Sequence, residues 1–277
     1  MSVVFDMTSP FALRYGGTDV SSNPLASPTI ELMLGHRSVR GYKPDPLPDG
    51  ALEAIITAAQ SAATSSNLQT WSVVHVTDPS VKAQCAALSG GQKQIEECPV
   101  FLLFLADLAR LNRVADRAGL PHAGNDSFEM FLVAAIDAAL AAQNAVVAAE
   151  SLGLSTVYIG AMRNKPEEAA ALIGLPQGAA VVFGLCIGYA ADGKGGSVKP
   201  RLPQEAVLHH GRYELEKQDA AIDGYNHAMA AFNERERVNT TTPWTIHSSR
   251  RVSGPESLSG RHALMQALRR MGFFKAE

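Results

Sequence analysis

The sequence predicts an α+β fold, and three observations support this. Four short apolar runs have the length and composition of buried strands, and the segments around them show helical spacing of apolar residues. The two kinds of segment do not alternate strictly, as a doubly wound sheet would require. With 277 residues and 46% hydrophobic composition, the chain has enough material for a substantial core, as one large domain with appendages or as two small domains.

The first third of the chain is expected to be mainly helical. Residues 1–27 end in turn-rich sequence and are expected to form an N-terminal arm. A helix begins at Pro28 after a Ser-Pro-Thr start signal and is expected to stop near Gly41. A second helix, over residues 49–62, follows the prolines and again places apolar residues on one face.

Strands and helices follow in irregular order. The expected strands are WSVVHVTD (71–78), VFLLFLAD (100–107), STVYIGAM (155–162) and AAVVFGLCIGYA (179–190). The expected helices are 79–88, a long alanine-rich helix over 127–152, a short one within 165–175, 217–233, and a terminal one from about Gly260. An irregular linker, TTTPW, is expected before the last of these.

Composition excludes several classes of protein. The net charge of −3 and the pI of about 6.2 give no basic field for nucleic acid, so an anion site must be local. Three widely spaced cysteines form no disulfide framework or zinc motif, and a cytoplasmic location is the simplest expectation. The N-terminus lacks the pattern of a signal peptide. The longest apolar stretch, 128–153, is interrupted by Asp137 and Glu150, so we expect a buried helix and no membrane span.

Four polar clusters carry possible chemistry. The first, GHRSVRGY, contains His36, Arg37, Ser38 and Arg40, and two guanidinium groups with a hydroxyl match a monophosphate. Its alternative is a solvated helix face whose arginines pair with Glu31 or Asp45. The others are ATSSNLQTW (63–71), GLSTVYIGAMRN (153–164) and GGSVKPRLP (195–203), which are equally compatible with a helix cap and turn, a tight connection and an ordinary basic loop.

Taken together, these motifs resemble the FMN-dependent nitroreductase superfamily, in its branch of oxygen-insensitive nitroreductases and NADPH–flavin oxidoreductases. The resemblance runs from Thr29 to Leu208 through HRSVRGY, SSNLQ, SGGQK, the 141–164 segment, VFGLCIGYAAD and KPRLP, in the family's order. It implies a mixed, mainly antiparallel sheet sandwiched by helices, in an interlocked homodimer with two sites at the interface. Residues 28–212 would form the FMN-binding core and 213–277 a C-terminal helical extension of the same domain.

The resemblance also implies roles for individual residues. His36, Arg37, Ser38 and Arg40 would hold the phosphate and ribityl chain of FMN, with Lys199 and Arg201 closing over the phosphate. Ser65, Ser66, Asn67 and Gln69 would come from the partner subunit. Gln92 and the backbone of Tyr158, Ile159 and Gly160 would lie along the flavin ring. Arg40, Arg235 and Arg237 would contact the nicotinamide cofactor, and no metal is expected.

The activity implied is ping-pong two-electron reduction of nitroaromatics, quinones or free flavin by NADPH or NADH, with the flavin carrying the chemistry. Alternatives are flavin supply to a monooxygenase, a chromate or azo reductase on the same fold, and a non-catalytic flavin-binding protein. No G-x-G-x-x-G opens a βαβ unit and no G-x-S-x-G is present, so neither a Rossmann cofactor site nor a hydrolase is expected. Ala161 departs from the family, which usually has a second glycine there.

NADPH is favoured over NADH by the C-terminal charge. Residues 233–277 contain eight basic and four acidic side chains, a local net charge of +4 that suits an anionic partner. Arg235 and Arg237 lie at the start of this segment, in NERERVNTTTPW, where the NADPH-specific branch carries an arginine-rich loop. TTT stands where further arginines would be expected.

Overall fold

The four apolar runs form one sheet. In the computed structural model, which describes residues 9–17 and 24–275, the strands lie in the order β1-β2-β4-β3 and every neighbouring pair is antiparallel. They are β1 (Trp71–His75), β2 (Val100–Asp107), β3 (Ser155–Ile159) and β4 (Ala179–Gly188). Ser38 adds an isolated parallel bridge to Thr156 of β3. The prediction of a mixed, mainly antiparallel sheet is therefore confirmed.

Both faces of the sheet are covered by helices. On β2, Phe101 and Leu103 pack into a cluster with the helices of one face, while Leu102 and Phe104 pack into a cluster with those of the other. This explains why β2 is a continuous apolar run, since a strand buried on both sides shows no alternation. The first face carries α4 (Pro79–Leu88), α5 (Gln94–Glu97) and α8 (Pro166–Leu172); the second carries α3 (Ala51–Gln60) and α7 (Phe128–Ser151).

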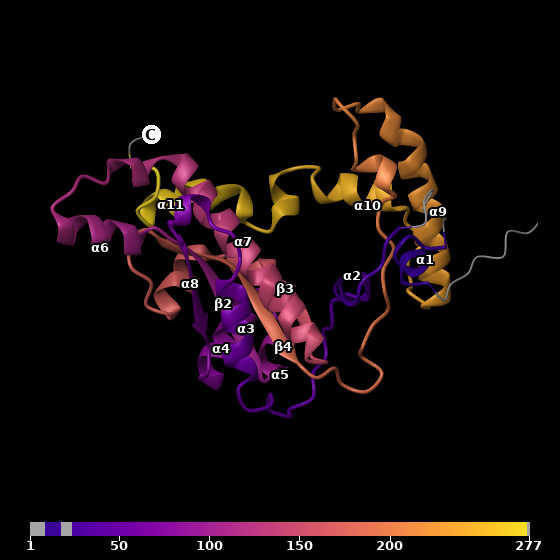
Figure 1. The fold of residues 1–277 in the computed structure, drawn as a ribbon, viewed down its shortest axis with the longest axis horizontal. Coiled ribbons are helices and arrows are strands. Elements are labelled where there is room, and N and C mark those ends of the chain that lie inside the picture. The colour runs from indigo at the N-terminus through magenta and orange to yellow at the C-terminus, as the bar shows by residue number, and fades with distance from the viewer. Residues whose placement is uncertain (1–8, 18–23, 276–277) are drawn as a thin grey trace, which may run out of the picture. The chain divides into compact units, whose positions relative to one another are not determined.

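The long helix α7 runs along the sheet beside α3 (Figure 1). It begins at the N-cap Ser127, whose hydroxyl accepts from the Met130 amide, and its buried side is mostly alanine. Small side chains let the helix lie close to the strands. Its length and composition would allow it to cross a membrane, but the packed alanine side and the buried Asp137 make it a core helix, as expected.

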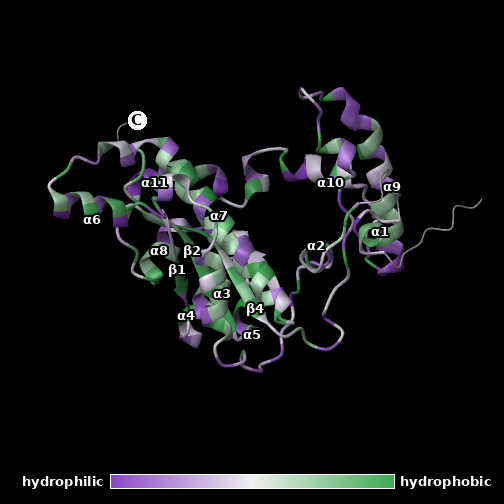
Figure 2. Cartoon of the chain, viewed as in Figure 1, coloured by the Kyte–Doolittle hydropathy of each residue, from purple (hydrophilic) through white to green (hydrophobic). Residues whose placement is uncertain are grey.

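The chain divides into two compact units. Unit 1 contains Met1–Arg37 and Gly196–Ser257, and unit 2 contains Ser38–Gly195 and Leu258–Glu277, including the whole sheet. Figure 2 shows the apolar colouring of β4 and α3 within unit 2. The predicted boundaries at 28, 212 and 213 remain a prediction.

Each unit has its own core. In unit 2, α11 (Leu264–Arg270) covers one end of the sheet, where Phe273 and Phe274 pack around Phe131 with ring centroids 5.2 and 5.4 Å away. In unit 1, Tyr225 is buried, stacks edge-on against Trp244 at 5.3 Å and donates its hydroxyl to the Pro200 carbonyl at 3.0 Å.

The remaining elements are short or peripheral. Unit 1 holds α1 (Pro10–Arg14), α2 (Pro28–Leu34), α9 (Asp219–Arg235) and α10 (Trp244–Arg251), and unit 2 holds α6 (Ala109–Ala118). The 3₁₀ turns are η1 (Ser65–Asn67), η2 (Ala123–Asp126), η3 (Gly160–Arg163), η4 (Gln204–Ala206), η5 (Glu216–Gln218), η6 (Pro255–Leu258) and η7 (Arg261–Ala263).

The end of one helix was predicted wrongly, and four helices were missed. The helix from Pro28 ends at Leu34 and not near Gly41, because the Val39 amide donates to the Thr156 carbonyl at 3.0 Å and draws this segment to the edge of β3. Helices α1, α5, α6 and α10 were not predicted. The first lies in the expected arm and the last begins at the end of the expected linker, whereas α5 and α6 lie in segments to which no element was assigned.

Candidate flavin site

The segment Ser65–Gln69 has an unusual backbone. Ser66, Asn67 and Gln69 have φ values of 50°, 56° and 53°, although none of them is glycine. Left-handed conformations of this kind cost about 1–3 kcal/mol each and persist only where the surroundings hold them. The segment must therefore be fixed from outside, and its conformation marks it as a functional candidate.

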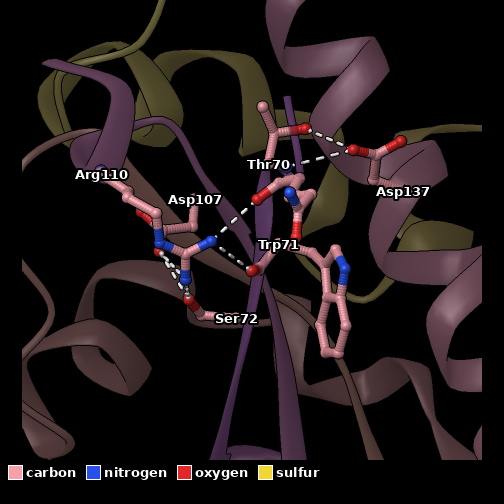
Figure 3. Close-up of polar contacts among 7 residues, drawn as sticks. Thr70, Trp71, Ser72, Asp107, Arg110 and Asp137 are labelled. Carbon is pink, nitrogen blue, oxygen red and sulfur yellow. Dashed lines mark hydrogen bonds and ion pairs between the residues drawn. The ribbon is translucent and has the colours of Figure 1, made fainter. Parts of the chain in front are cut away.

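Asp137 fixes the segment from the side of α7. Asp137 is 1% exposed, and its carboxylate accepts from the Ser65 amide at 3.1 Å. It also accepts from the Thr70 amide at 3.1 Å and the Thr70 hydroxyl at 2.9 Å (Figure 3). The two amides flank the left-handed residues. One buried carboxylate thus ties both ends of the loop to the central helix.

Arg110 holds the other side of the same segment. Its guanidinium donates to the carbonyl oxygens of Gln69 at 2.8 Å and Trp71 at 3.2 Å, and to the Ser72 hydroxyl at 2.6 Å. Asp107 orients it, because this carboxylate accepts from Ser72 at 2.6 Å and lies 3.4 Å from the guanidinium. A cavity of about 620 Å³ adjoins this network and is lined by Leu68, Gln69, Trp71 and Arg110 among others.

The end of β3 gathers a second group of predicted residues. Tyr158 and Ile159 close the strand and Gly160 opens η3. Ser38 bridges Thr156 near the beginning of the same strand, and Arg40 follows two residues later and is exposed. The side chain of Tyr158 is partly buried, and desolvation raises the pKa of its hydroxyl.

Gln92 is anchored near η3. It lies in the turn after α4, where its amide donates to the Ser89 carbonyl at 3.3 Å and accepts from Gln94 at 2.6 Å. The Ser89 hydroxyl in turn contacts the sulfur of Met162 in η3 at 3.0 Å. The fold therefore brings the SGGQ turn against η3, which directly follows β3, so Gln92 and the end of β3 can contribute to one binding surface.

Arg163 was missed by the sequence reasoning. A Cβ placed on Gly160 would lie 3.5 Å from its guanidinium, which also donates to the Val182 carbonyl. Burial, followed by the charge of Arg261, lowers its pKa. Two arginines close enough to oppose each other electrostatically, one of them against Gly160, suit an anionic ligand. Its place in the motif GLSTVYIGAMRN could have identified Arg163, but that motif was interpreted only as a strand end where a ligand approaches the backbone.

Two of the segments predicted to bind phosphate lie next to each other. Within unit 1, the carbonyl oxygens of His36 and Lys199 both accept from the Arg14 guanidinium, so the two segments lie side by side although 163 positions separate them. The side chains of Arg37, Lys199 and Arg201 are exposed. Among the described residues, Arg37 forms no ion pair with Glu31 and Arg40 none with Asp45, so the proposed acidic pairing is wrong.

The segment Ser65–Gln69 and the end of β3 do not meet within one chain. Thr70 pairs with Asp107, which lies opposite Ala179 of β4, whereas Ile159 lies opposite Gly184. Strands β1 and β3 are the two edges of the sheet. Three strand spacings and about four residues of rise place Thr70 about 20 Å from Gly160.

Arg235 and Arg237, two of the arginines predicted to contact the nicotinamide cofactor, differ in their surroundings. Arg235 lies 3.0 Å from a Glu236 oxygen and its guanidinium lies 5.4 Å from the centre of the Phe232 ring. Arg237 is exposed, just past the end of α9, with a φ of 52°.

Within unit 1, a cavity of about 720 Å³ is lined by Tyr15, Lys199, Arg201, Leu202, Val207, Tyr225, Met229, Asn233, Val238, Thr240, Thr242, Trp244 and His247.

Known proteins share both the sequence and this fold. The oxygen-insensitive NADPH nitroreductase of Salmonella typhimurium is 39% identical over 81% of this chain and 90% of its own length. The Cr(VI) reductase of a Pseudomonas species is 41% identical over 78% and 88%. Among solved structures, NfrA1 of B. megaterium has a TM-score of 0.84 and 37% identity over 90% of this chain and all of its own.

A further solved structure is that of a complex. The NADPH:FMN oxidoreductase of Vibrio harveyi, complexed with NAD⁺, has a TM-score of 0.78 and 33% identity over 89% of this chain and 99% of its own. The model of the nitroreductase family matches residues 33–189, and the model of the family's C-terminal domain matches residues 199–276. The chain therefore belongs to the nitroreductase family.

Proposed function

We propose that this protein is an FMN-dependent NAD(P)H oxidoreductase that reduces nitroaromatics, quinones or free flavin. The observation that carries the proposal is the juxtaposition of the His36–Arg37 and Lys199–Arg201 segments within unit 1. Three exposed cations on two adjoining loops, without acidic partners among the described residues, match the charge of a phosphate monoester. Ser38 and Arg40 follow directly in the chain.

The residues at the end of β3 fit an isoalloxazine ring. Tyr158, Ile159 and Gly160 offer backbone groups at a strand end, and Gln92 offers an amide already oriented by two hydrogen bonds. Arg163 would stabilise negative charge on the ring or on an anionic substrate. Bound FMN would supply hydride and electron transfer between the nicotinamide cofactor and the acceptor.

We propose that the protein works as a homodimer. The distance of about 20 Å between Gly160 and Thr70, which follows Ser65–Gln69 directly, supports a site completed by the partner's copy of that segment. Helix α7 supports it further, because Phe128, Leu132, Ile136 and Leu140 form an exposed apolar stripe at intervals of four residues. A partly exposed apolar stripe of this kind suits contact with a second copy of the chain.

NADPH is the proposed reductant. Arg237 is exposed at the start of the 233–277 segment, whose net charge is positive, and Arg40 is exposed three positions after Arg37. Arg235 contributes less, because Glu236 lies against it. The V. harveyi relative is named for NADPH and was solved with NAD⁺, which supports the proposal that this fold accepts both nicotinamide cofactors. We place this activity in the cytoplasm, where three buried free thiols are stable.

The acceptor is proposed as a class. Relatives named for nitro compounds, FMN and Cr(VI) resemble this chain to similar degrees, which supports a pocket of broad acceptance. The test is to reconstitute the protein with FMN, add NADPH without oxygen and record the absorbance at the flavin band. Bleaching followed by recovery with a nitroaromatic, a quinone, FMN or chromate supports the enzyme. If FMN binds but stays oxidised when NADPH is added, the oxidoreductase proposal fails and a flavin-storage protein is supported instead.

A further inference from the structure

The N-terminal helix α1 lies outside the residues that both family models match. Those models begin at residues 33 and 199, whereas α1 spans Pro10–Arg14. The described part of this segment is nevertheless bound into unit 1. Arg14, its last residue, is 7% exposed. A long charged side chain is rarely buried to this extent unless its hydrogen bonds are met.

Arg14 joins the two segments proposed to hold phosphate. One guanidinium nitrogen donates to the Lys199 carbonyl at 3.0 Å, and another donates to the carbonyls of Leu34 at 2.5 Å and His36 at 2.7 Å. Leu34 is the last residue of α2, so the positive charge also lies at the carboxyl end of that helix, where it is favourable. The planar, fixed geometry of guanidinium lets one side chain hold both backbones at once.

The backbone of the same segment adds two contacts. The Arg201 amide donates to the Arg14 carbonyl at 2.9 Å. Gly16 has a φ of 67°, and a Cβ there would come within 3.0 Å of Ala228 and 3.2 Å of Pro200. Only glycine allows this backbone both its conformation and its close approach. The segment Arg14–Gly16 therefore contacts each of the residues Lys199, Pro200 and Arg201.

We propose that Arg14 is a positioning residue of the phosphate site, supplied by an N-terminal segment beyond the family's matched region. This rests on the proposed FMN function, and it concerns how the site is held and not what it binds. Arg14 is too buried to touch the phosphate. It fixes the backbones that carry Arg37, Lys199 and Arg201, so their cations are already converged before FMN arrives. Preorganisation of this kind raises affinity by reducing the ordering cost of binding.

The test compares two ligands that differ only in the phosphate. Binding of FMN and of riboflavin to apoprotein is measured by flavin fluorescence for the full-length native protein, Arg14→Met, Arg14→Lys and the control Arg212→Met. Arg212 belongs to the same unit, but its side chain is 84% exposed. We expect Arg14→Met to weaken FMN binding about ten-fold or more and to leave riboflavin binding within about two-fold. Arg14→Lys should recover part of the loss, and the control should match the native protein.

The ratio of the two affinities separates the outcomes. A general loss of folding would weaken both ligands and lower the melting temperature, without changing their ratio. If the native protein prefers FMN to riboflavin and Arg14→Met keeps that preference in full, this inference is refuted while the proposed function stands. If the native protein binds neither flavin, the proposed function itself fails. Gly16→Ala provides a second variant, which should move the ratio in the same direction through the backbone alone.

Discussion

Replacing Asp137 by asparagine should both destabilise the protein and loosen the flavin site. The native carboxylate accepts three hydrogen bonds from the two ends of the Ser65–Gln69 segment. An asparagine has nearly the same shape but only one acceptor oxygen. The Thr70 hydroxyl can rotate to accept from the new amide, yet either orientation of the side chain leaves one backbone amide, of Ser65 or of Thr70, facing a donor.

The magnitude follows from what is lost. One buried amide left without a partner costs about 1–3 kcal/mol, and the remaining bonds lose the charge that makes them roughly twice as strong as neutral ones. We therefore expect Asp137→Asn to lower the free energy of unfolding by about 2–4 kcal/mol. Strain in the left-handed residues is released at the same time, so the loop should leave its native conformation before the protein unfolds.

The assay combines urea unfolding with FMN titration. Thr70→Val removes only the hydroxyl partner and should cost about 1 kcal/mol, and the double variant should cost less than the sum because both changes act on one network. Asp223→Asn on the exposed face of α9 is the control and should stay within about 0.5 kcal/mol of native. If Asp137→Asn unfolds like that control, the carboxylate does not hold the loop. If stability falls but FMN affinity does not, the loop is not part of the flavin site.

Three further outcomes are expected. Arg37→Ala or Arg201→Ala should weaken FMN retention about ten-fold or more with little change in melting temperature, because both side chains are exposed; normal flavin occupancy in both variants would make them ordinary surface charges. Arg237→Ala should lower kcat/KM for NADPH about ten-fold and leave NADH unaffected, and an equal loss for both would contradict the assignment. Burial raises the pKa of Cys85 to about 11 and also raises the pKa of Cys186 well above its usual value, so both stay protonated at pH 8. Thiol titration with a disulfide reagent at that pH should be slow in the native protein and immediate in denaturant, and fast native labelling would contradict the buried core.

Much of the fold followed from local patterns. The limits of α4 and β2 were predicted to the residue, because Asp78 and the preceding turn mark a helix start and a continuous apolar run marks a strand buried on both faces. Helix α6 was not predicted, although Leu111, Val114, Ala115 and Ala118 have the helical spacing of apolar residues that could have revealed it. The helix from Pro28 was predicted too long, since nothing local reveals that Val39 will pair with β3.

The sequence alone determined which residue types are available for the chemistry: two arginines beside a serine in one segment, a lysine and an arginine in another, and a polar loop before a strand. Only the tertiary structure decided which of these meet. It brings residues 36 and 199 to one guanidinium, and it sets Ser65–Gln69 and Gly160 at opposite edges of the sheet. Periodicity and turn chemistry act over a few residues, whereas these relations depend on strand order and on packing between distant segments. For the same reason, Arg14 became visible only once its three carbonyl partners were in place.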